Sequence, residues 1–130
     1  MAVRFPVFRQ FSATDANAPA ADVTTVTGAG TYYSAPWSGL DADGYSATTQ
    51  WTGTIAGTLT MWSTDKPFPD MATDADWVQD TTYAPTNPAG AAGISADSAG
   101  NAKGALKRQK LVVASGTGTI GTWVSVPRGR

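Results

Sequence analysis

The acidic residues of this chain are all Asp, and glycine and proline are spaced along its whole length. It contains no Glu and few Lys, which are among the better helix formers, whereas its abundant Thr, Gly, Val and Trp favour strands and turns. The 14 Gly and 8 Pro interrupt any long helical pattern. These features predict an all-β protein, and 130 residues is the length of one domain.

Alternation of apolar and polar residues indicates about eight short strands separated by turn signals. The alternation is clearest where Tyr45, Ala47, Thr49 and Trp51 share one face, which predicts that Trp51 lies in the core. Strands are expected at residues 3–11, 22–26, 31–37, 45–53, 55–64, 77–83, 105–115 and 117–126. Their number and spacing predict an antiparallel sandwich or barrel.

The sequence Thr-Gly-Thr-Ile occurs twice, at 52–55 and at 117–120, and each copy is followed by Gly-Thr and an alternating run that contains a Trp. Glycine between β-branched residues is typical of a place where a strand reverses, because Gly adopts the positive φ that tight turns require. We therefore expect two hairpin corners of one sandwich. Twelve similar residues are too few to indicate a duplicated domain.

Two segments do not fit the strand pattern. Pro6 cannot donate a hydrogen bond to a neighbouring strand, so residues 3–11 are expected to form an edge strand or an arm. We assign residues 1–21 to an N-terminal arm and linker and residues 22–130 to the sandwich domain, and the apolar residues of 1–11 predict docking on a neighbouring subunit. Residues 84–104 contain Ile94 as their one large apolar anchor, which predicts a functional loop or one held by a partner.

Several stretches in order resemble a known family: YYSAPWSGLDADGYSATTQWTGTIAGTLTMWSTDK, WVQDTT, PAG, KRQKLVV and SGTGTIGTWVSV. Together they resemble small jelly-roll or galactose-binding-like β-sandwich proteins of tailed-phage virions. The resemblance covers residues 31–126 and leaves out the arm at 1–21 and an Asp- and Pro-rich insertion at 65–76. It implies a single antiparallel β-sandwich, jelly-roll-like, with a structural or attachment role in the virion and no catalysis.

The residue types limit the chemistry open to the chain. Without His or Cys there is no Ser-His or Cys-His nucleophile and no Cys-based metal site. A glycosidase would need two Asp at a defined separation, because Glu is absent. The candidates Asp70, Asp74, Asp76 and Asp80 are typical of turns and strand ends. We therefore predict no catalytic residue.

Two short stretches begin like a Ca²⁺-binding loop, DADG at 41–44 and TDAD at 73–76. Neither continues with the further ligands and the final Glu that such a loop requires. We expect Asx-type turns at both places, no metal and no cofactor.

Charge and hydropathy also argue against nucleic acid and membrane as partners. A net charge of −1 does not suit nucleic-acid binding. No apolar run approaches the length of a membrane-spanning helix, and the N-terminal residues lack the features of a signal peptide. We expect the protein to be soluble, to be made in the host cytoplasm and to make no contact with a membrane.

Basic and aromatic residues are the candidates for an interface. Trp62 and Trp123 oppose the aliphatic parity of their strands, so they face outward or into a second layer. A solvated basic face, or an aromatic platform that stacks on a sugar, would explain the same residues. The predicted interface residues are Arg4, Phe5, Phe8, Arg9, Trp62, Lys107, Arg108, Lys110, Trp123, Arg128 and Arg130.

These inferences favour a non-enzymatic structural protein of a bacteriophage particle, most specifically a decoration (cement) protein on the capsid. Its expected partners are the major capsid protein or other virion proteins, and further copies of itself in a homo-oligomer such as a trimer. In assembly proteins, Pro-containing arms and long loops without regular structure commonly become ordered when they contact neighbouring subunits. The alternatives are a tail, baseplate or glycan-binding receptor module, and a free-standing carbohydrate-binding module.

Overall fold

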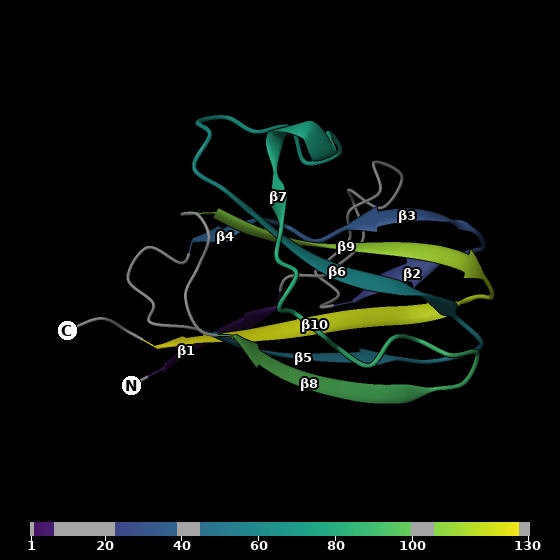
Figure 1. Ribbon diagram of the computed structural model, residues 1–130. Coiled ribbons are helices and arrows are strands. Elements are labelled where there is room, and N and C mark those ends of the chain that lie inside the picture. The colour runs from purple at the N-terminus through teal and green to yellow at the C-terminus, as the bar shows by residue number, and fades with distance from the viewer. Residues whose placement is uncertain (1, 7–22, 39–44, 100–105, 128–130) are drawn as a thin grey trace.

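The computed structural model describes residues 2–6, 23–38, 45–99 and 106–127 (Figure 1). These residues form strands and one short 3-10 turn, η2 (Asp74–Asp76), and contain no α-helix. The strands are β1 (Ala2–Pro6), β2 (Thr24–Val26), β3 (Gly30–Tyr33), β4 (Trp37–Ser38), β5 (Tyr45–Trp51), β6 (Ala56–Thr64), β7 (Val78–Gln79), β8 (Gly93–Ala99), β9 (Leu106–Ser115) and β10 (Gly118–Pro127). The predicted all-β fold is confirmed.

The strands form two antiparallel sheets that lie face to face as layers (Figure 1). Sheet A has the order β1-β10-β5-β8, with β2 also pairing with β10, and sheet B has the order β3-β9-β6-β7, with β4 also pairing with β9. If β1 and β2 count as one edge position, and β3 and β4 as another, the chain has eight positions. Their order is that of a jelly roll, as predicted.

The core lies between the inner faces of the two sheets. It contains Val26, Trp37, Ala47, Trp51, Ile55, Leu59, Met61, Tyr83, Leu111, Val113, Ile120 and Val124. Trp51 is 4% exposed, which confirms its predicted place in the core. The core also contains polar pairs, such as the hydroxyls of Thr49 and Thr122, which lie 2.8 Å apart on neighbouring strands. Such pairs satisfy the hydrogen-bonding capacity of buried Thr.

The two Thr-Gly-Thr stretches lie side by side and bond to each other. Thr54 N donates to Thr117 O at 2.8 Å, and Thr52 N donates to Thr119 O at 2.9 Å. Each stretch crosses between sheets, because β5 and β10 belong to sheet A whereas β6 and β9 belong to sheet B. Both predicted corners are present, but the expectation that they are hairpins is wrong, because each joins strands of different sheets. Alternation locates strands and does not assign them to sheets.

The N-terminal strand belongs to the sandwich of its own chain. β1 pairs with β10 from Ala2 opposite Pro127 to Pro6 opposite Trp123. β2 pairs only with the first residues of β10, 118–120, so the rest of that edge of β10 is available to pair with β1. The prediction that residues 1–11 dock on a neighbour is wrong for residues 2–6, which form the edge strand that Pro6 also allowed. The rest of the predicted arm and linker, 7–21, lies outside the described residues.

The segment expected to be a long loop at 84–104 is ordered by its own chain. Residues 93–99 form β8, which pairs with β5 along its whole length. Before it, the chain covers the edge of β6: Leu59 N donates to Asn87 Oδ1 at 2.7 Å, and Gly57 N donates to Pro88 O at 3.1 Å. The loop prediction is wrong for 93–99, because small residues gave β8 little apolar alternation. Residues 100–104 lie outside the described part of the chain.

Candidate functional site

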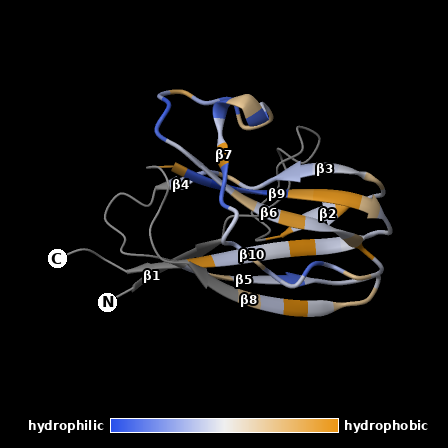
Figure 2. Ribbon diagram, viewed as in Figure 1, coloured by the Kyte–Doolittle hydropathy of each residue, from blue (hydrophilic) through white to orange (hydrophobic). Residues whose placement is uncertain are grey.

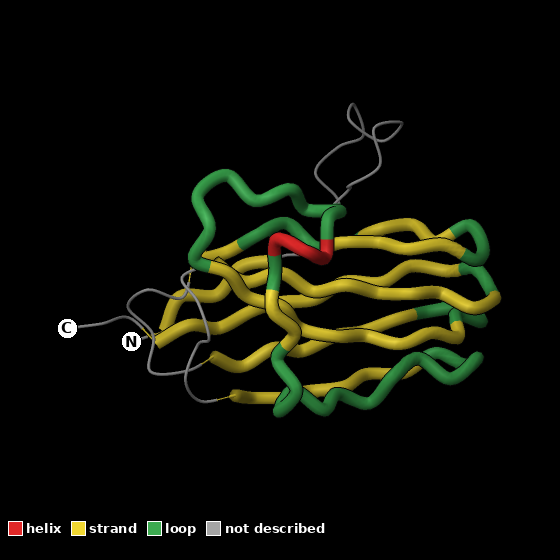
Figure 3. The backbone as a smooth tube through the Cα atoms, turned by 45° about the horizontal axis from the view of Figure 1, so that its top comes forward, coloured by secondary structure: helices red, strands yellow, loops and turns green. Residues whose placement is uncertain are grey.

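The residues between β6 and β7, 65–77, form a loop over the outer face of sheet B (Figures 1 and 3). We call it the 65–77 loop. Asp70 organises its second half, because its carboxylate accepts a hydrogen bond from Ala72 N at 2.9 Å and its carbonyl accepts one from Trp77 Nε1 at 2.9 Å. Asp76 binds back to Asp70 N at 2.9 Å and forms an ion pair with Lys66. The second half of the loop is thus a bonded unit.

Strand β9 presents charged residues to both faces of sheet B. Leu111 and Val113 point into the core, and Lys107 and Gln109 share their parity. Arg108 and Lys110 are on the other face, beneath the 65–77 loop. Figure 2 shows that β9, after its first residue, changes from hydrophilic to hydrophobic along its length. Arg108 is nevertheless 0% exposed, so other side chains must cover it.

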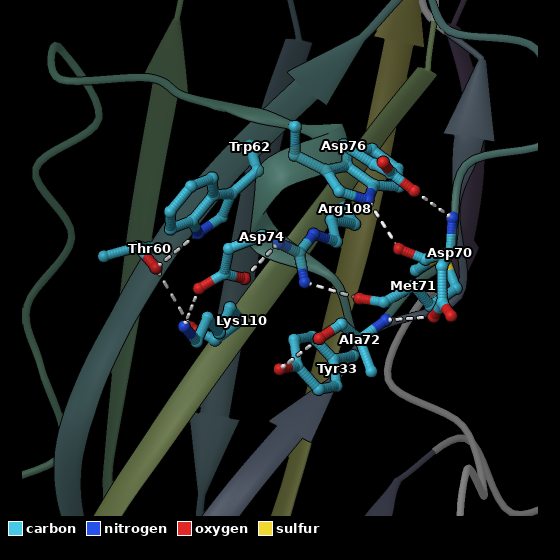
Figure 4. A network of polar contacts seen from close by, with 11 residues as sticks. Tyr33, Thr60, Trp62, Asp70, Met71, Ala72, Asp74, Asp76, Arg108 and Lys110 are labelled. Atoms are coloured by element: carbon cyan, nitrogen blue, oxygen red, sulfur yellow. Dashed lines mark hydrogen bonds and ion pairs between the residues drawn. The ribbon is translucent and has the colours of Figure 1, made fainter.

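Three aromatic rings and the 65–77 loop cover Arg108 (Figure 4). The guanidinium carbon lies 4.8 Å from the ring centre of Tyr33, 4.9 Å from that of Trp77 and 5.1 Å from that of Trp62. One guanidinium nitrogen donates to Met71 O at 2.6 Å, and another donates to Asp74 Oδ1 at 2.6 Å. We call Arg108, the three rings and Asp74 the Arg108 clamp.

The clamp offsets the cost of burying a charge. A guanidinium without partners in a dry site is strongly unfavourable, whereas a carboxylate, a carbonyl and aromatic faces each stabilise it. Arg suits this place better than Lys, since its planar fork donates in two directions while its faces stack on rings. Lys110 also forms an ion pair with Asp74, on the side of the carboxylate away from Arg108. The chemical result is attachment of the loop to sheet B.

The pKa of Asp74 makes this attachment dependent on pH. Desolvation by burial acts to raise the pKa, but hydrogen bonds from Lys110 and Arg108 outweigh it and hold the pKa below the ordinary value of 3.8. A carboxylate with a lowered pKa stabilises the fold above its ordinary pKa and loses that effect as the pH falls through its folded value. The clamp is therefore complete at neutral pH.

Replacing Asp74 by Asn is expected to lower the free energy of unfolding at pH 7 by about 1 kcal/mol, a modest value for charged hydrogen bonds because the side chain is 40% exposed. The difference between the wild type and Asp74→Asn should shrink as the pH falls below 3.8, because the carboxyl of the unfolded wild type takes up a proton there before the folded one does. Urea unfolding of both proteins from pH 7 to pH 3 measures this. A difference that stays constant over the whole range would contradict it.

Phe68 is the most exposed large apolar side chain that the structure describes. Its side chain is 98% exposed, and its φ of 57° is in the left-handed region. A bulky residue rarely adopts this conformation, which costs on the order of 1–3 kcal/mol. Pro67 and Pro69 restrict the chain on both sides of it. A strained, exposed Phe thus projects from a loop that the clamp attaches to the sandwich.

The structure changes the interpretation of the predicted interface residues on β9. Lys107 is 1% exposed and Arg108 is 0% exposed, so the prediction that they form an exposed contact surface is wrong. Their charges suggested a solvent-facing cluster, but the two sheets and the 65–77 loop enclose them. Lys110 keeps 17% of its side chain exposed and is engaged by Asp74. Trp62 is half-buried in the clamp, which agrees with the expectation of a second layer.

The remaining predicted residues are not brought together by the described structure. Trp123 is half-buried on β10, directly opposite Thr48 of β5. Arg4 and Phe5 are described only as backbone of β1. The others, Phe8, Arg9, Arg128 and Arg130, lie outside the described residues. Phe68 was missed, although a Phe between two Pro in a polar loop was the signal available for it.

The Asp candidates have structural partners. Asp80 is 2% exposed and accepts hydrogen bonds from both N and Oγ1 of Thr82, which is the geometry of an Asx turn. Within the described residues there is no group of three or more metal-ligating side chains, and Asp41 and Asp43 fall outside them.

The same part of the chain contains no helix with the length and apolarity needed to cross a membrane.

Comparison of the chain with protein-family models, curated proteins and solved structures finds no match. The resemblance to phage virion proteins therefore stays a prediction.

Proposed function

We propose that the chain is a non-enzymatic structural protein of a bacteriophage particle that binds the capsid through the 65–77 loop, as a decoration protein. The virion assignment depends on the resemblance of residues 31–126. The choice of contact depends on one observation, the exposure of Phe68 on a loop attached by the Arg108 clamp. No catalytic group is needed for this role.

The position of Phe68 argues for binding rather than folding. At 98% exposure its side chain contributes almost no burial to the stability of its own chain, and its left-handed backbone adds a cost. Aromatic residues that enter a partner's pocket commonly dominate the binding energy of an interface. Because the loop is bonded internally and to Arg108, little conformational entropy would be lost on binding.

The charges near Phe68 indicate what charge the partner surface is expected to have. Asp65 and Asp70 are exposed on the same loop, and the loop's single basic residue, Lys66, forms an ion pair with Asp76, so the loop has a net negative charge. We infer an apolar pocket with basic residues at its rim on the capsid surface, because charges of opposite sign at a rim favour association.

Replacing Phe68 by Ala is expected to weaken binding to particles about 30-fold, the effect of losing roughly 2 kcal/mol at an interface hot spot. The melting temperature should not fall, since the exposed ring packs on little. Co-sedimentation of the purified chain with heads that lack it measures the affinity. Val112→Ala is the matched control, because Val112 is an apolar residue of sheet B that is 43% exposed.

The outcome decides between the proposed function and its alternatives. Wild type that does not bind heads, or Phe68→Ala that binds them equally well, would contradict the proposal. Binding to purified tails instead of heads would favour a tail or baseplate component. The carboxylate beside Trp62 is engaged by Arg108 and Lys110, so the residue pair that a glycan would need is already used within the chain. Saturable binding to host glycans would overturn that argument.

A further inference from the structure

β8 is the longest strand at an edge of the two described sheets (Figure 1). The opposite edge of sheet A is divided between β1 and β2, and one edge of sheet B is divided between β3 and β4. The remaining edge of sheet B has the two residues of β7, and the segment before β8 bonds to the rest of β6. β8 alone offers seven residues in one uninterrupted run.

The ladder fixes which backbone groups of β8 point outward. In an antiparallel ladder, every second residue of a strand bonds to the same neighbour. Thr52 N, which follows β5, donates to Thr119 O of β10. The even-numbered residues of β5 therefore bond to β10, and the odd-numbered residues bond to β8. Thr49 is opposite Ser95, so the odd-numbered residues of β8 bond to β5. The N–H and C=O groups of Ile94, Ala96 and Ser98 therefore point away from the sheet. No hydrogen bond joins these groups to another described residue.

β8 also lacks most of the features that usually prevent edge pairing. It contains no Lys, no Pro and no register shift along β5, its one charged residue is Asp97, and its Ile94 is 64% exposed. Proteins commonly protect long edges with such residues or with bulges, because an open edge accepts another strand. An unprotected edge of this length is suited to strand addition.

We propose that β8 pairs antiparallel with β8 of a second copy of this chain, about a two-fold axis at Ala96. This register uses all seven residues, because Ala96 is the midpoint of Gly93–Ala99. It places Ile94 opposite Ser98 of the second copy. The outer face of sheet A in one copy then lies on the same side as the outer face of sheet A in the other. It also places Asp97 opposite Ser95 of the second copy, whereas a two-fold axis at residue 97 would oppose like charges. The two copies of sheet A become one continuous sheet.

Sedimentation of the full chain over a wide concentration range tests the pairing. The wild type is expected to dimerise. Ala96→Lys and Ala96→Asp should each weaken dimerisation about fivefold or more, because each places a charge opposite itself at the axis. An equimolar mixture of the two variants should restore a mixed dimer, since Lys then faces Asp. Val112→Lys, on the other sheet, should dimerise like the wild type.

A wild type that stays monomeric at every concentration would overturn the proposal, and so would an Ala96→Lys variant that dimerises as tightly as the wild type. Failure of the mixture to recover the dimer would reject the axis at Ala96. Melting curves separate these results from unfolding, because the side chain of Ala96 is exposed and its replacement leaves the core intact. The result does not depend on whether Phe68 contacts a capsid.

Discussion

Gly116→Ala is expected to lower the free energy of unfolding by about 4 kcal/mol, among the largest effects of a single substitution. Gly116 has a φ of +95°, and a Cβ there would lie 2.0 Å from Thr54 O and 3.0 Å from the Cα of Ile55. Both contacts are backbone atoms, which cannot turn away as a flexible side chain can. Ile55 is fully buried, so a shift of this corner would also disturb the core. Thermal melting should show a fall of roughly 10–20 °C.

Gly90→Ala is the matched control for this experiment. Gly90 has a similar φ of +84°, but a Cβ there would have nothing within 4 Å. The control therefore measures the cost of the left-handed conformation alone, about 1 kcal/mol. If Gly116→Ala and Gly90→Ala melt at the same temperature, the close approach of the two Thr-Gly-Thr corners does not constrain the fold.

The corners show what sequence patterns can predict in this chain. Gly between Thr residues indicated where strands change direction, because few other residues tolerate the backbone there. The same pattern could not show that Thr52 and Thr54 bond to Thr119 and Thr117, since pairing between distant corners depends on the order of strands in both sheets. The β class and the buried Trp51 followed from composition and alternation, whereas the jelly roll was expected from the family resemblance.

The candidate site was less predictable because its parts are distant in sequence. The rings of Tyr33, Trp62 and Trp77 meet over Arg108 only after three separate segments have folded onto β9. A run of Lys and Arg normally indicates a solvated surface, and nothing local to β9 announces that Arg108 becomes fully buried. β8 was missed for a related reason, because its small residues acquire their role from pairing with β5.

Arg108→Ala is expected to lower the free energy of unfolding by about 3 kcal/mol. The change removes a fully buried side chain and leaves a void beneath three rings. It also removes the hydrogen bonds to Met71 O and Asp74, which attach the 65–77 loop to β9. The cost stays below that of a fully buried broken ion pair, because Asp74 is 40% exposed and keeps Lys110. Urea unfolding gives the value.

Two variants separate charge from shape in this result. Arg108→Lys keeps a positive charge but cannot reach Met71 O and Asp74 together while stacking on rings, so an intermediate loss is expected. Lys110→Ala leaves the buried cation and its rings in place and should cost no more than about 1 kcal/mol. Equal losses for Arg108→Lys and Arg108→Ala would mean that the fork geometry, rather than the charge, stabilises the clamp.

Hydrogen exchange shows whether Arg108 holds the loop in place. The amides of Thr73, Asp76 and Trp77 all donate within the loop, so their exchange should accelerate in Arg108→Ala while the amides of β5 and β10 remain protected. Because a mobile loop would have to be ordered again on binding, the same variant should bind particles more weakly although Phe68 is unchanged. If Arg108→Ala leaves both loop exchange and binding as in the wild type, the rings alone position Phe68 and the clamp has no part in recognition.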